Sequence, residues 1–462
     1  MKKLLLALTA VLLLVVAGCR DTQPPPEASP QIVKVDSKIA LPPEVKEASY
    51  LVDTSHLVDA LAEVPLPVAL RFTLKAAPAN LNVFLNGELL VPLSAAAGLR
   101  DFEIDRAGIL RFSASGYRAI EHHSSALPIR GGIVGIKLEL ENGLLRLLGE
   151  YATGRQPKSA YFSPDGQRVF LPLLAQHGID VFRRNGDLLA FEQRLTVPGS
   201  GASGFVEALF DEKRRELWVS NMEKNTVHIF DLDTLEYKGS FSTGGVFPKV
   251  IAQSPDGSLT VVSNWVTRDV SVFDTDTREL LRRIPVGGIP RGMAFSPDGS
   301  LLYTAIFDEP LIAVVDMAQN RVTNRFRFYA GAGAARHVIY RGGRLYVSDM
   351  FRGTVNILNA ATGALLRSRR VGPNINTIVL SPDARYIFAS SRGHNNPAGY
   401  TLPGPDFGAV FMLRTEDLSL VERVWGRNQP TGLDISPCGR LMFFTDFLDA
   451  NLQLYLLPDG SD

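Results

Sequence analysis

The chain has 462 residues, of which 45% are hydrophobic, and it contains 40 glycines and 29 prolines. This length and composition favour an all-β protein with many turns and room for a second domain. Lysine plus arginine equals aspartate plus glutamate at 48 each, which argues against a general nucleic-acid binder but permits local charged patches.

The N-terminal residues have the pattern of an export signal. A positive start, Lys2-Lys3, precedes an apolar run, Leu4–Val16, that is too short to span a bilayer comfortably. Val15–Cys19 then resembles a bacterial lipobox, in which the cysteine is lipidated and becomes the mature N-terminus. The resemblance implies a signal peptide over residues 1–18 and acyl chains such as palmitate on Cys19, which anchor the protein to a membrane. The alternative is an export signal with an incidental cysteine.

Residues 19–47 are predicted to form a lipidated flexible tether, because proline-rich polar runs such as the one at 23–27 do not pack. Arg20 stands where an inner-membrane retention signal would usually show aspartate, so the outer membrane is favoured if the cell has one. Cys19 and Cys438 are the only cysteines, and lipidation of the first leaves no disulfide available. The folded part is therefore expected to be held by its core.

Residues 48–141 are predicted to form a small β-sandwich. Alternating runs at 69–74 and 81–85 are typical of strands, and Asn86-Gly87 is a strong hairpin turn. Ala77-Pro78 and the segments at 83–87 and 113–117 resemble the PEGA-type β domain of bacterial envelope proteins. The resemblance implies a spacer, or a contact with the cell wall or another protein, rather than an enzyme.

From Gly154 to the C-terminus, a pattern of about forty residues repeats seven times. Its clearest copy, at 286–299, contains Ser-Pro-Asp-Gly and is followed by two strand-like runs. A fixed period of this length carried by short strands is typical of a β-propeller with one repeat per blade. The predicted fold is all-β, with a seven-bladed propeller over residues 142–462.

The landmarks of the repeat stay in phase along the chain. The turn between its first and second strands begins at Ser163, Ser254 and Ser296, and strand runs such as 217–221 and 270–274 follow at matching distances. These residues resemble the YVTN family of seven-bladed propellers, which includes many bacterial surface and envelope proteins. The resemblance implies the fold, whereas function depends on sites that a propeller merely carries.

The last repeat has no room for an outer strand after Leu457. The apolar run at 144–150, just before the first repeat, is predicted to supply that strand. Such pairing would close the ring and remove an open sheet edge. The alternative is that the run ends the preceding sandwich.

Equivalent positions at the start of the first strand point to a binding site beside the central channel. In chain order they hold Lys158, Val206, Lys249, Arg291, Arg336, Asn376 and Thr431. Four of the seven are basic in a chain of zero net charge, and converging cations favour an anionic ligand such as a carboxylate, a phosphate or an acidic loop. The alternative is that each cation pairs with a neighbouring acid or points into solvent.

The sixth repeat carries a long glycine- and proline-rich loop at 391–408, between its second and third strands. Long loops on a rigid scaffold often carry binding function, although a tolerated insertion is the alternative. The candidate ligand-binding residues in this loop are Arg392, His394, Asn395, Tyr400, Asp406 and Phe407, with the aromatic side chains expected to be exposed.

The loop also resembles propeller lactonases, in which an Arg-Gly-His segment lies near the sugar-lactone site. This resemblance implies His394 as a general base and Arg392 as a ligand for a phosphate or an oxyanion. The family's other acid and arginine partners have no counterpart at matching positions. We therefore expect no catalytic residues and keep a hydrolase using Arg392 and His394 as an alternative.

Other chemistry is not indicated. The chain has no phosphate-binding loop, nucleophile elbow or metal-ligand spacing, so neither cofactor nor metal is expected. The polar residues after the second strands, Asn221, Asn264, Asp349 and Asp446, are interpreted as turn caps. The sequence thus predicts a membrane-anchored cell-envelope lipoprotein whose propeller binds a protein or an anionic ligand without catalysis, with no nucleic-acid partner. A scaffold subunit of an envelope assembly is a further alternative.

Overall fold

The computed structural model describes residues 65–96, 98–201 and 203–458. The predicted signal peptide, Cys19, the tether and the first part of the predicted sandwich lie outside the described residues. Across the described ranges, no helix is long and apolar enough to cross a bilayer. The helical structure described there is a 3-10 turn, η1 (Ser124–Ala126).

The N-terminal domain contains two β-sheets that share one core. The first has the order β4-β5-β1-β9-β8 and the second the order β3-β2-β6-β7. Phe72 and Phe102 come from paired strands of the first sheet, and Phe112 comes from the second; all three are buried in the common core. Asn86 and Gly87 both have positive φ, as the predicted hairpin turn between β2 and β3 requires. The PEGA resemblance of this domain stays a prediction.

The strands of this domain are β1 (Pro65–Ala77), β2 (Asn82–Leu85), β3 (Glu88–Leu89), β4 (Ser94–Ala96), β5 (Leu99–Arg106), β6 (Ile109–Ser113), β7 (Ile120–His123), β8 (Ile129–Arg130) and β9 (Ile133–Lys137).

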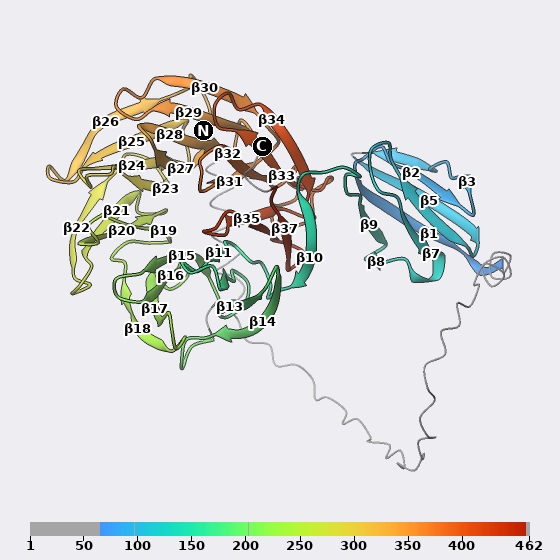
Figure 1. Ribbon diagram of the computed structural model, residues 1–462, viewed down its shortest axis with the longest axis horizontal. Helices are drawn as coiled ribbons and strands as arrows, with labels where there is room; N and C mark the ends of the chain where they lie inside the picture. The colour runs from blue at the N-terminus through green and yellow to red at the C-terminus, as the bar shows by residue number, and fades with distance from the viewer. Residues whose placement is uncertain (1–64, 97, 202, 459–462) are drawn as a thin grey trace, which may run out of the picture. The chain divides into compact units, whose positions relative to one another are not determined.

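Seven four-stranded sheets follow, and Figure 1 shows them arranged in a ring about a common axis. They confirm the predicted seven-bladed propeller. Each blade is numbered by its repeat, and its innermost strand comes first. Blades 1 to 3 are β11 (Tyr161–Phe162), β12 (Arg168–Pro172), β13 (Ile179–Asn185) and β14 (Leu188–Leu195); β15 (Phe205–Asp211), β16 (Glu216–Asn221), β17 (Thr226–Asp231) and β18 (Tyr237–Ser242); and β19 (Pro248–Gln253), β20 (Leu259–Asn264), β21 (Asp269–Asp274) and β22 (Leu280–Pro285).

Blades 4 to 6 are β23 (Pro290–Phe295), β24 (Leu301–Ile306), β25 (Leu311–Asp316) and β26 (Arg321–Arg327); β27 (Ala335–Arg341), β28 (Arg344–Asp349), β29 (Thr354–Asn359) and β30 (Leu365–Arg370); and β31 (Ile375–Leu380), β32 (Tyr386–Ser391), β33 (Ala409–Arg414) and β34 (Leu420–Trp425). Blade 7 is β35 (Pro430–Ile435), β36 (Leu441–Asp446), β37 (Asn451–Leu456) and β10 (Arg146–Ala152).

Neighbouring blades pack through the apolar side chains of their middle strands. Val261 and Val272 of blade 3 share a core cluster with Leu302 and Val315 of blade 4. Both faces of a middle strand are covered, so successive residues of β24 are buried from Leu302 to Ile306. This explains why these strands read as continuous apolar runs rather than as alternating patterns.

The Ser-Pro-Asp-Gly motif closes the turn between the first two strands of a blade. In blade 4, the Ser296 hydroxyl donates to Asp298 at 2.5 Å and accepts the N–H of Leu301 at 3.0 Å. Gly299 takes a φ of +71°, which a residue without a Cβ adopts most easily. The motif therefore fixes where each second strand begins.

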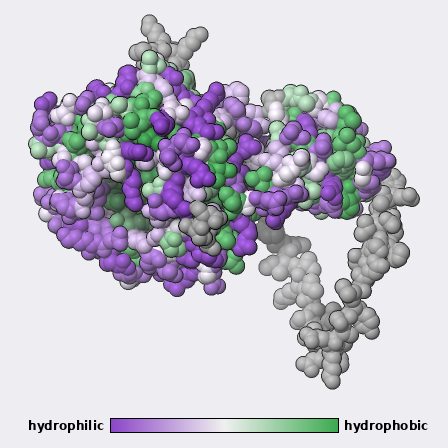
Figure 2. All heavy atoms as spheres, turned by 45° about the horizontal axis from the view of Figure 1, so that its top comes forward, coloured by the Kyte–Doolittle hydropathy of each residue, from purple (hydrophilic) through white to green (hydrophobic). Residues whose placement is uncertain are grey.

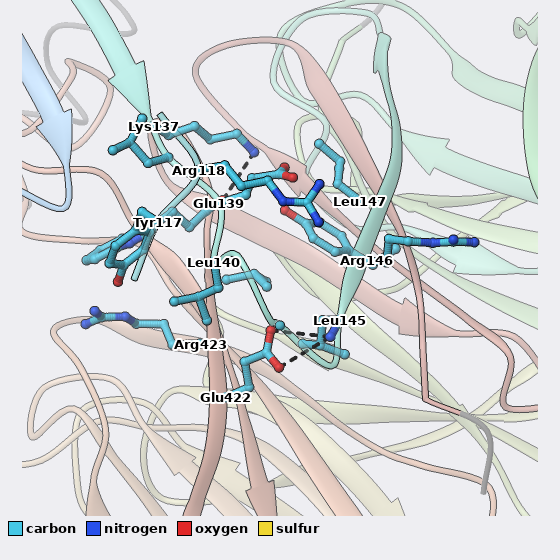
Figure 3. Close-up of a pocket in the computed structure, with 15 residues that line it drawn as sticks. Tyr117, Arg118, Lys137, Glu139, Leu140, Leu145, Arg146, Leu147, Glu422 and Arg423 are labelled. Carbon is cyan, nitrogen blue, oxygen red and sulfur yellow. Dashed lines mark hydrogen bonds between the residues drawn. The ribbon is translucent and has the colours of Figure 1, made fainter. Parts of the chain in front are cut away.

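The ring is closed by a strand from the beginning of the propeller sequence. β10 pairs antiparallel with β37, from Arg146 opposite Leu456 to Ala152 opposite Asn451, and forms the outer strand of blade 7. β10 begins and ends two residues later than the closing strand predicted at 144–150. The turn before it is held by blade 6, because the carboxylate of Glu422 accepts the N–H groups of Leu144 at 2.6 Å and of Leu145 at 3.3 Å, the second of which Figure 3 shows.

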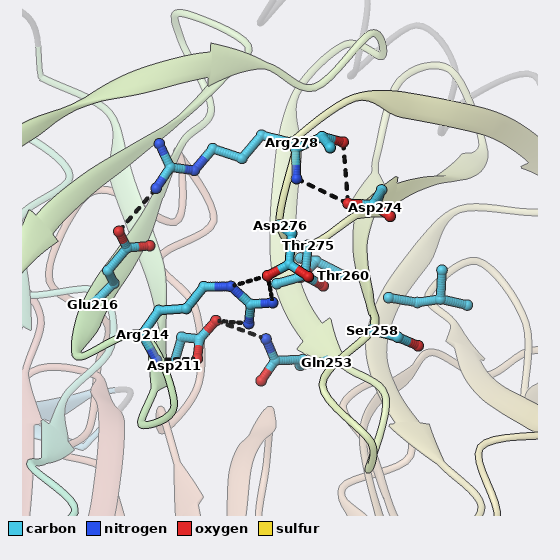
Figure 4. Close-up of polar contacts among 12 residues, drawn as sticks. Asp211, Arg214, Glu216, Gln253, Ser258, Thr260, Asp274, Thr275, Asp276 and Arg278 are labelled. Carbon is cyan, nitrogen blue, oxygen red and sulfur yellow. Dashed lines mark hydrogen bonds and ion pairs between the residues drawn. The ribbon is translucent and has the colours of Figure 1, made fainter.

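Charged contacts add to the packing between blades 2 and 3 (Figure 4). Arg214 pairs with Asp211 of its own blade at 2.8 Å and donates to Asp276 of blade 3 at 3.0 Å. Gln253 of blade 3 donates to the same Asp211 carboxylate at 3.0 Å.

On the face of the molecule seen in Figure 2, hydrophilic residues predominate and the hydrophobic ones form scattered groups.

Replacing Glu422 with alanine is expected to lower the free energy of unfolding by about 1–3 kcal/mol, because the buried N–H of Leu145 loses its acceptor at the start of the closing strand. Urea unfolding followed by intrinsic fluorescence measures the effect. Glu422→Gln keeps one acceptor oxygen and should recover most of the loss. Glu416→Ala, at an exposed position of the same blade, is the control. Equal stability of the wild type and Glu422→Ala would contradict a role in closure.

Candidate functional site

The candidate site is a group of cations at the central channel. Lys249, Arg291 and Arg336 are each the second residue of an inner strand, and their exposed fractions are only 8%, 4% and 7%. Lys158, at the equivalent position before β11, is half-buried. Arg392 from the long loop of blade 6 joins them, because its guanidinium carbon and Lys158 Nζ lie 5.7 Å and 4.7 Å from the ring centre of the same residue, Phe447. These five residues are called the channel cations below.

Hydroxyl groups of neighbouring blades fix the backbone at these positions. Ser220 at the end of β16 donates to the carbonyl of Lys249 at 2.6 Å, and Ser263 of β20 donates to that of Arg291 at 3.1 Å. Ser348 makes the same contact with the carbonyl of Asn376 at 2.9 Å. Each contact joins the second strand of one blade to the inner strand of the next, so the blades hold the cations in register.

One carboxylate pairs with the channel cations among the described residues. Glu207 accepts from Arg291 at 2.6 Å and from the hydroxyl of Tyr161 at 2.7 Å. Burial alone would raise the pKa of Glu207, but Arg291 and Arg336 hold it below its usual value. Asp434 and Glu207 line one cavity together with Arg291 and Arg336. Burial raises the pKa of Asp434 to about 7, so its carboxyl group is only partly charged near neutral pH. The predicted alternative is that each cation pairs with an acid or points into solvent. Within the described ranges an ion pair holds Arg291 alone, and Lys249 and Arg336 are buried.

The unpaired cations lie in an unfavourable environment. Burial, followed by the charges of the neighbouring cations, lowers the pKa of Lys158 and of Lys249 well below the usual lysine value. Arg291 Nη1, Arg392 Nε and both amide atoms of Asn376 are buried without a hydrogen-bond partner in the described protein. Buried polar groups are normally satisfied, so these atoms mark a place where a polar ligand or water fits.

A bulge in β15 brings Glu207 to the site, although the alignment of the repeats places Val206 there. The pairing of β15 with β16 is irregular between Phe205 and Ala208, and corresponding shifts occur in the other inner strands after the first. A bulge lets two successive residues reach the same side of a strand. Glu207 therefore lines the channel together with residues from the other blades, although only Val206 occupies the aligned position.

The structure divides the predicted loop residues between the channel and the surface. Arg392 is buried, donates to Gln429, and lies 5.5 Å from the ring centre of Tyr400. His394 is exposed, and its Nδ1 is 2.9 Å from Asp406 Oδ2. Asn395 is also exposed.

Two further predicted site residues, Phe407 and Thr431, are buried in the structure. Phe407 was expected to be exposed, but it is only 5% exposed because Lys75 covers its ring at 4.7 Å. The loop residue Gly404 accepts from the same lysine at 2.7 Å. Thr431 is fully buried, and its hydroxyl donates to the carbonyl of Gln429 at 2.8 Å.

A set of mostly apolar residues beside the cations was not predicted. In each blade, one residue just after the second strand donates its N–H to a backbone carbonyl near the start of the inner strand. That carbonyl lies two residues before the position of Lys249 or its equivalent in the other blades. These donors are Leu174, Met222, Trp265, Phe307, Met350, Arg392 and Phe447. All except Arg392 are apolar, and these six are called the apolar tier below. Four of its members can be recognised in the sequence, because each directly follows one of the polar residues Asn221, Asn264, Asp349 and Asp446.

Two of the four polar residues interpreted as turn caps have that role. The Asn264 amide instead donates to Asp269 and Ser271, and Asp446 accepts from Arg427 and Gln453. Asn221 Oδ1 accepts the N–H groups of Glu223 and Lys224, and Asp349 Oδ1 accepts that of Arg352 at 2.9 Å. No group of three or more histidine, cysteine, aspartate or glutamate side chains suited to a metal ion occurs in the described ranges. The interpretation as caps is confirmed at Asn221 and Asp349.

The seven sheets around one channel define a β-propeller, and the model of the YNCE-like β-propeller family matches residues 150–298. Antigen Lp49 from Leptospira interrogans is 34% identical over 332 residues, which cover 69% of this chain and 71% of the relative. The chain therefore belongs to the same family of β-propeller proteins as Antigen Lp49.

Two more distant relatives are similar to parts of the chain. The seven-bladed β-propeller protein Rv1057 from Mycobacterium tuberculosis is 29% identical over 132 residues, 28% of this chain and 34% of the relative. Protein NirF from Pseudomonas aeruginosa is 26% identical over 221 residues, 47% of this chain and 46% of the relative. These matches agree with the propeller predicted from the repeats, whereas the lipobox stays a prediction.

Replacing Lys249 with methionine is expected to stabilise the ligand-free protein by about 1 kcal/mol or more, because a buried ammonium group without a carboxylate partner gives way to an apolar chain of similar length. Urea unfolding in low-salt buffer without multivalent anions measures the difference. Lys224→Met, at an exposed position, is the control and should change little. A clear loss of stability in Lys249→Met would contradict the view that the buried ammonium group of Lys249 destabilises the ligand-free protein.

The stabilisation should shrink as the pH rises. The folded pKa of Lys249 lies below that of the unfolded chain, so between the two values the unfolded chain binds more protons. The wild type therefore gains stability as the pH rises through this window. The stability difference between the wild type and Lys249→Met should therefore shrink as the pH rises toward the unfolded pKa of about 10. A constant difference would show that charge is not the cause.

Proposed function

We propose that this protein is a cell-envelope lipoprotein, anchored to a membrane through Cys19, whose propeller binds an anionic ligand at the channel cations without catalysis. The observation that carries the proposal is the convergence of Lys158, Lys249, Arg336 and Arg392 with no carboxylate in ion-pair distance among the described residues. A bound anion would supply the missing negative charge and accept hydrogen bonds from the guanidinium groups.

The envelope location is supported by the sequence before the folded domains. The lipobox-like segment Val15–Cys19 and the proline-rich stretch after it suit a body held off a membrane. The relative Antigen Lp49 bears a name that suits a protein exposed to the outside of a cell. If the cell has two membranes, Arg20 favours the outer one.

The hydrolase alternative gains little from the geometry. Arg392 is buried among the channel cations, whereas the side chain of His394 is 65% exposed and held by Asp406. A general base has to lie within hydrogen-bond reach of the same substrate that the arginine binds. The separation of the two environments favours binding over lactone hydrolysis. The scaffold alternative depends on rim contacts, for which we propose no site.

Sulfate titrated into the full-length protein in detergent at low ionic strength is expected to show saturable binding by calorimetry. Arg336→Gln should weaken it by about tenfold or more, because one buried charge-assisted contact is lost. Arg344→Gln, an exposed substitution in the next strand of the same blade, is the matched control and should bind like the wild type.

Two results would overturn the proposal. One is the absence of saturable sulfate binding by the wild type. The other is an equal loss in Arg336→Gln and Arg344→Gln, which would indicate general surface charge rather than the channel.

A further inference from the structure

Three residues of the apolar tier, Met222, Trp265 and Phe447, lie beside channel cations. Lys249 Nζ is 2.8 Å from the sulfur of Met222 and 5.6 Å from the ring centre of Trp265. Lys158 Nζ is 4.7 Å from the ring centre of Phe447. A ligand whose charged group reaches Lys249 can therefore also contact Met222 or Trp265 of the apolar tier.

Part of the apolar tier remains open. Met222, Trp265, Phe307 and Met350 are half-buried, in contrast to the fully buried Phe447. The rings of Trp265 and Phe307 contact each other with their centres 4.6 Å apart, which gives one aromatic surface across blades 3 and 4. Covering such a surface with an apolar group releases water and adds binding energy.

The polar groups at the channel suit the other end of the same ligand. Arg291 Nη1 and Arg392 Nε are buried donors without a partner in the described protein, and Asn376 offers an unused amide. Guanidinium donors prefer planar anions such as carboxylates, which accept two hydrogen bonds side by side. A site that combines buried donors with a nearby apolar wall fits small molecules with a polar end and an apolar body.

Building on the proposed function, we propose that the ligand is an amphipathic acid. Its anionic group lies among the channel cations, and its apolar body packs against the apolar tier at Trp265 and Phe307. The apolar contact selects this ligand over small hydrophilic anions, which can use only the cations.

The test compares three probes of the full-length protein by calorimetry: sulfate, acetate and 2-naphthoate. Acetate and 2-naphthoate share the same carboxylate, so their affinity ratio isolates the contribution of the apolar body. The wild type is expected to bind 2-naphthoate at least about tenfold more tightly than acetate, as expected when an aromatic body is partly buried. The double variant Trp265→Ala/Phe307→Ala should lose this preference and keep its sulfate affinity.

Phe351→Ala is the matched control for nonspecific adhesion of naphthoate. Phe351 is 69% exposed and follows Met350 of the apolar tier in the sequence. The proposal predicts that Phe351→Ala keeps the wild-type preference.

The outcomes separate this proposal from the one it rests on. If sulfate binds but acetate and 2-naphthoate bind with equal affinity, the proposal of an amphipathic ligand is overturned and the proposal of anion binding stands. This is the result expected if the ligand is an acidic protein loop. A preference that survives in Trp265→Ala/Phe307→Ala, or disappears in Phe351→Ala, would also overturn it. Failure of sulfate and of both carboxylates to bind would overturn both proposals.

Discussion

The pairing of β10 with β37 is the constraint on which the arrangement of the propeller depends. This strand exchange completes blade 7 and removes the open edges that a linear row of sheets would leave. Closure makes all seven inner strands surround the same channel. Lys158 of blade 1 and Arg392 of blade 6 influence each other because blade 7 joins their two blades. The electrostatic site is therefore a product of the closed ring, and no single blade contains it.

The site has an energetic cost that the packing of the blades offsets. Buried cations with few carboxylate partners repel each other and lose hydration. Against this, apolar clusters run between neighbouring blades, and Ser220, Ser263 and Ser348 bond across blade boundaries to the backbone of the inner strands. A rigid scaffold can keep charges in a geometry that suits a ligand better than it suits the empty protein.

The repeat allowed much of the propeller to be predicted, because its turns and strands are local features that recur in phase. Ser296 and Gly299 have the same roles in the turn that their motif suggests, and the aligned residues Lys249 and Arg336 occupy equivalent positions of their inner strands. The missed residues depend on contacts between distant segments. A bulge brings Glu207 to the channel, and only the folded structure shows that Phe407 is buried beneath Lys75. Four residues of the apolar tier recur in phase with the repeat, each directly after one of the polar residues Asn221, Asn264, Asp349 and Asp446.

The measurement that tests the central claim most directly is proton uptake on binding of sulfate, by calorimetry near pH 9 in buffers of different ionisation enthalpy. The lowered pKa values of Lys158 and Lys249 mean that part of their population is neutral there, and a bound anion should draw protons onto them. We predict uptake of a measurable fraction of a proton by the wild type, reduced in Lys249→Met. Sulfate binding without proton uptake, or with the same uptake in Lys249→Met, would contradict the account.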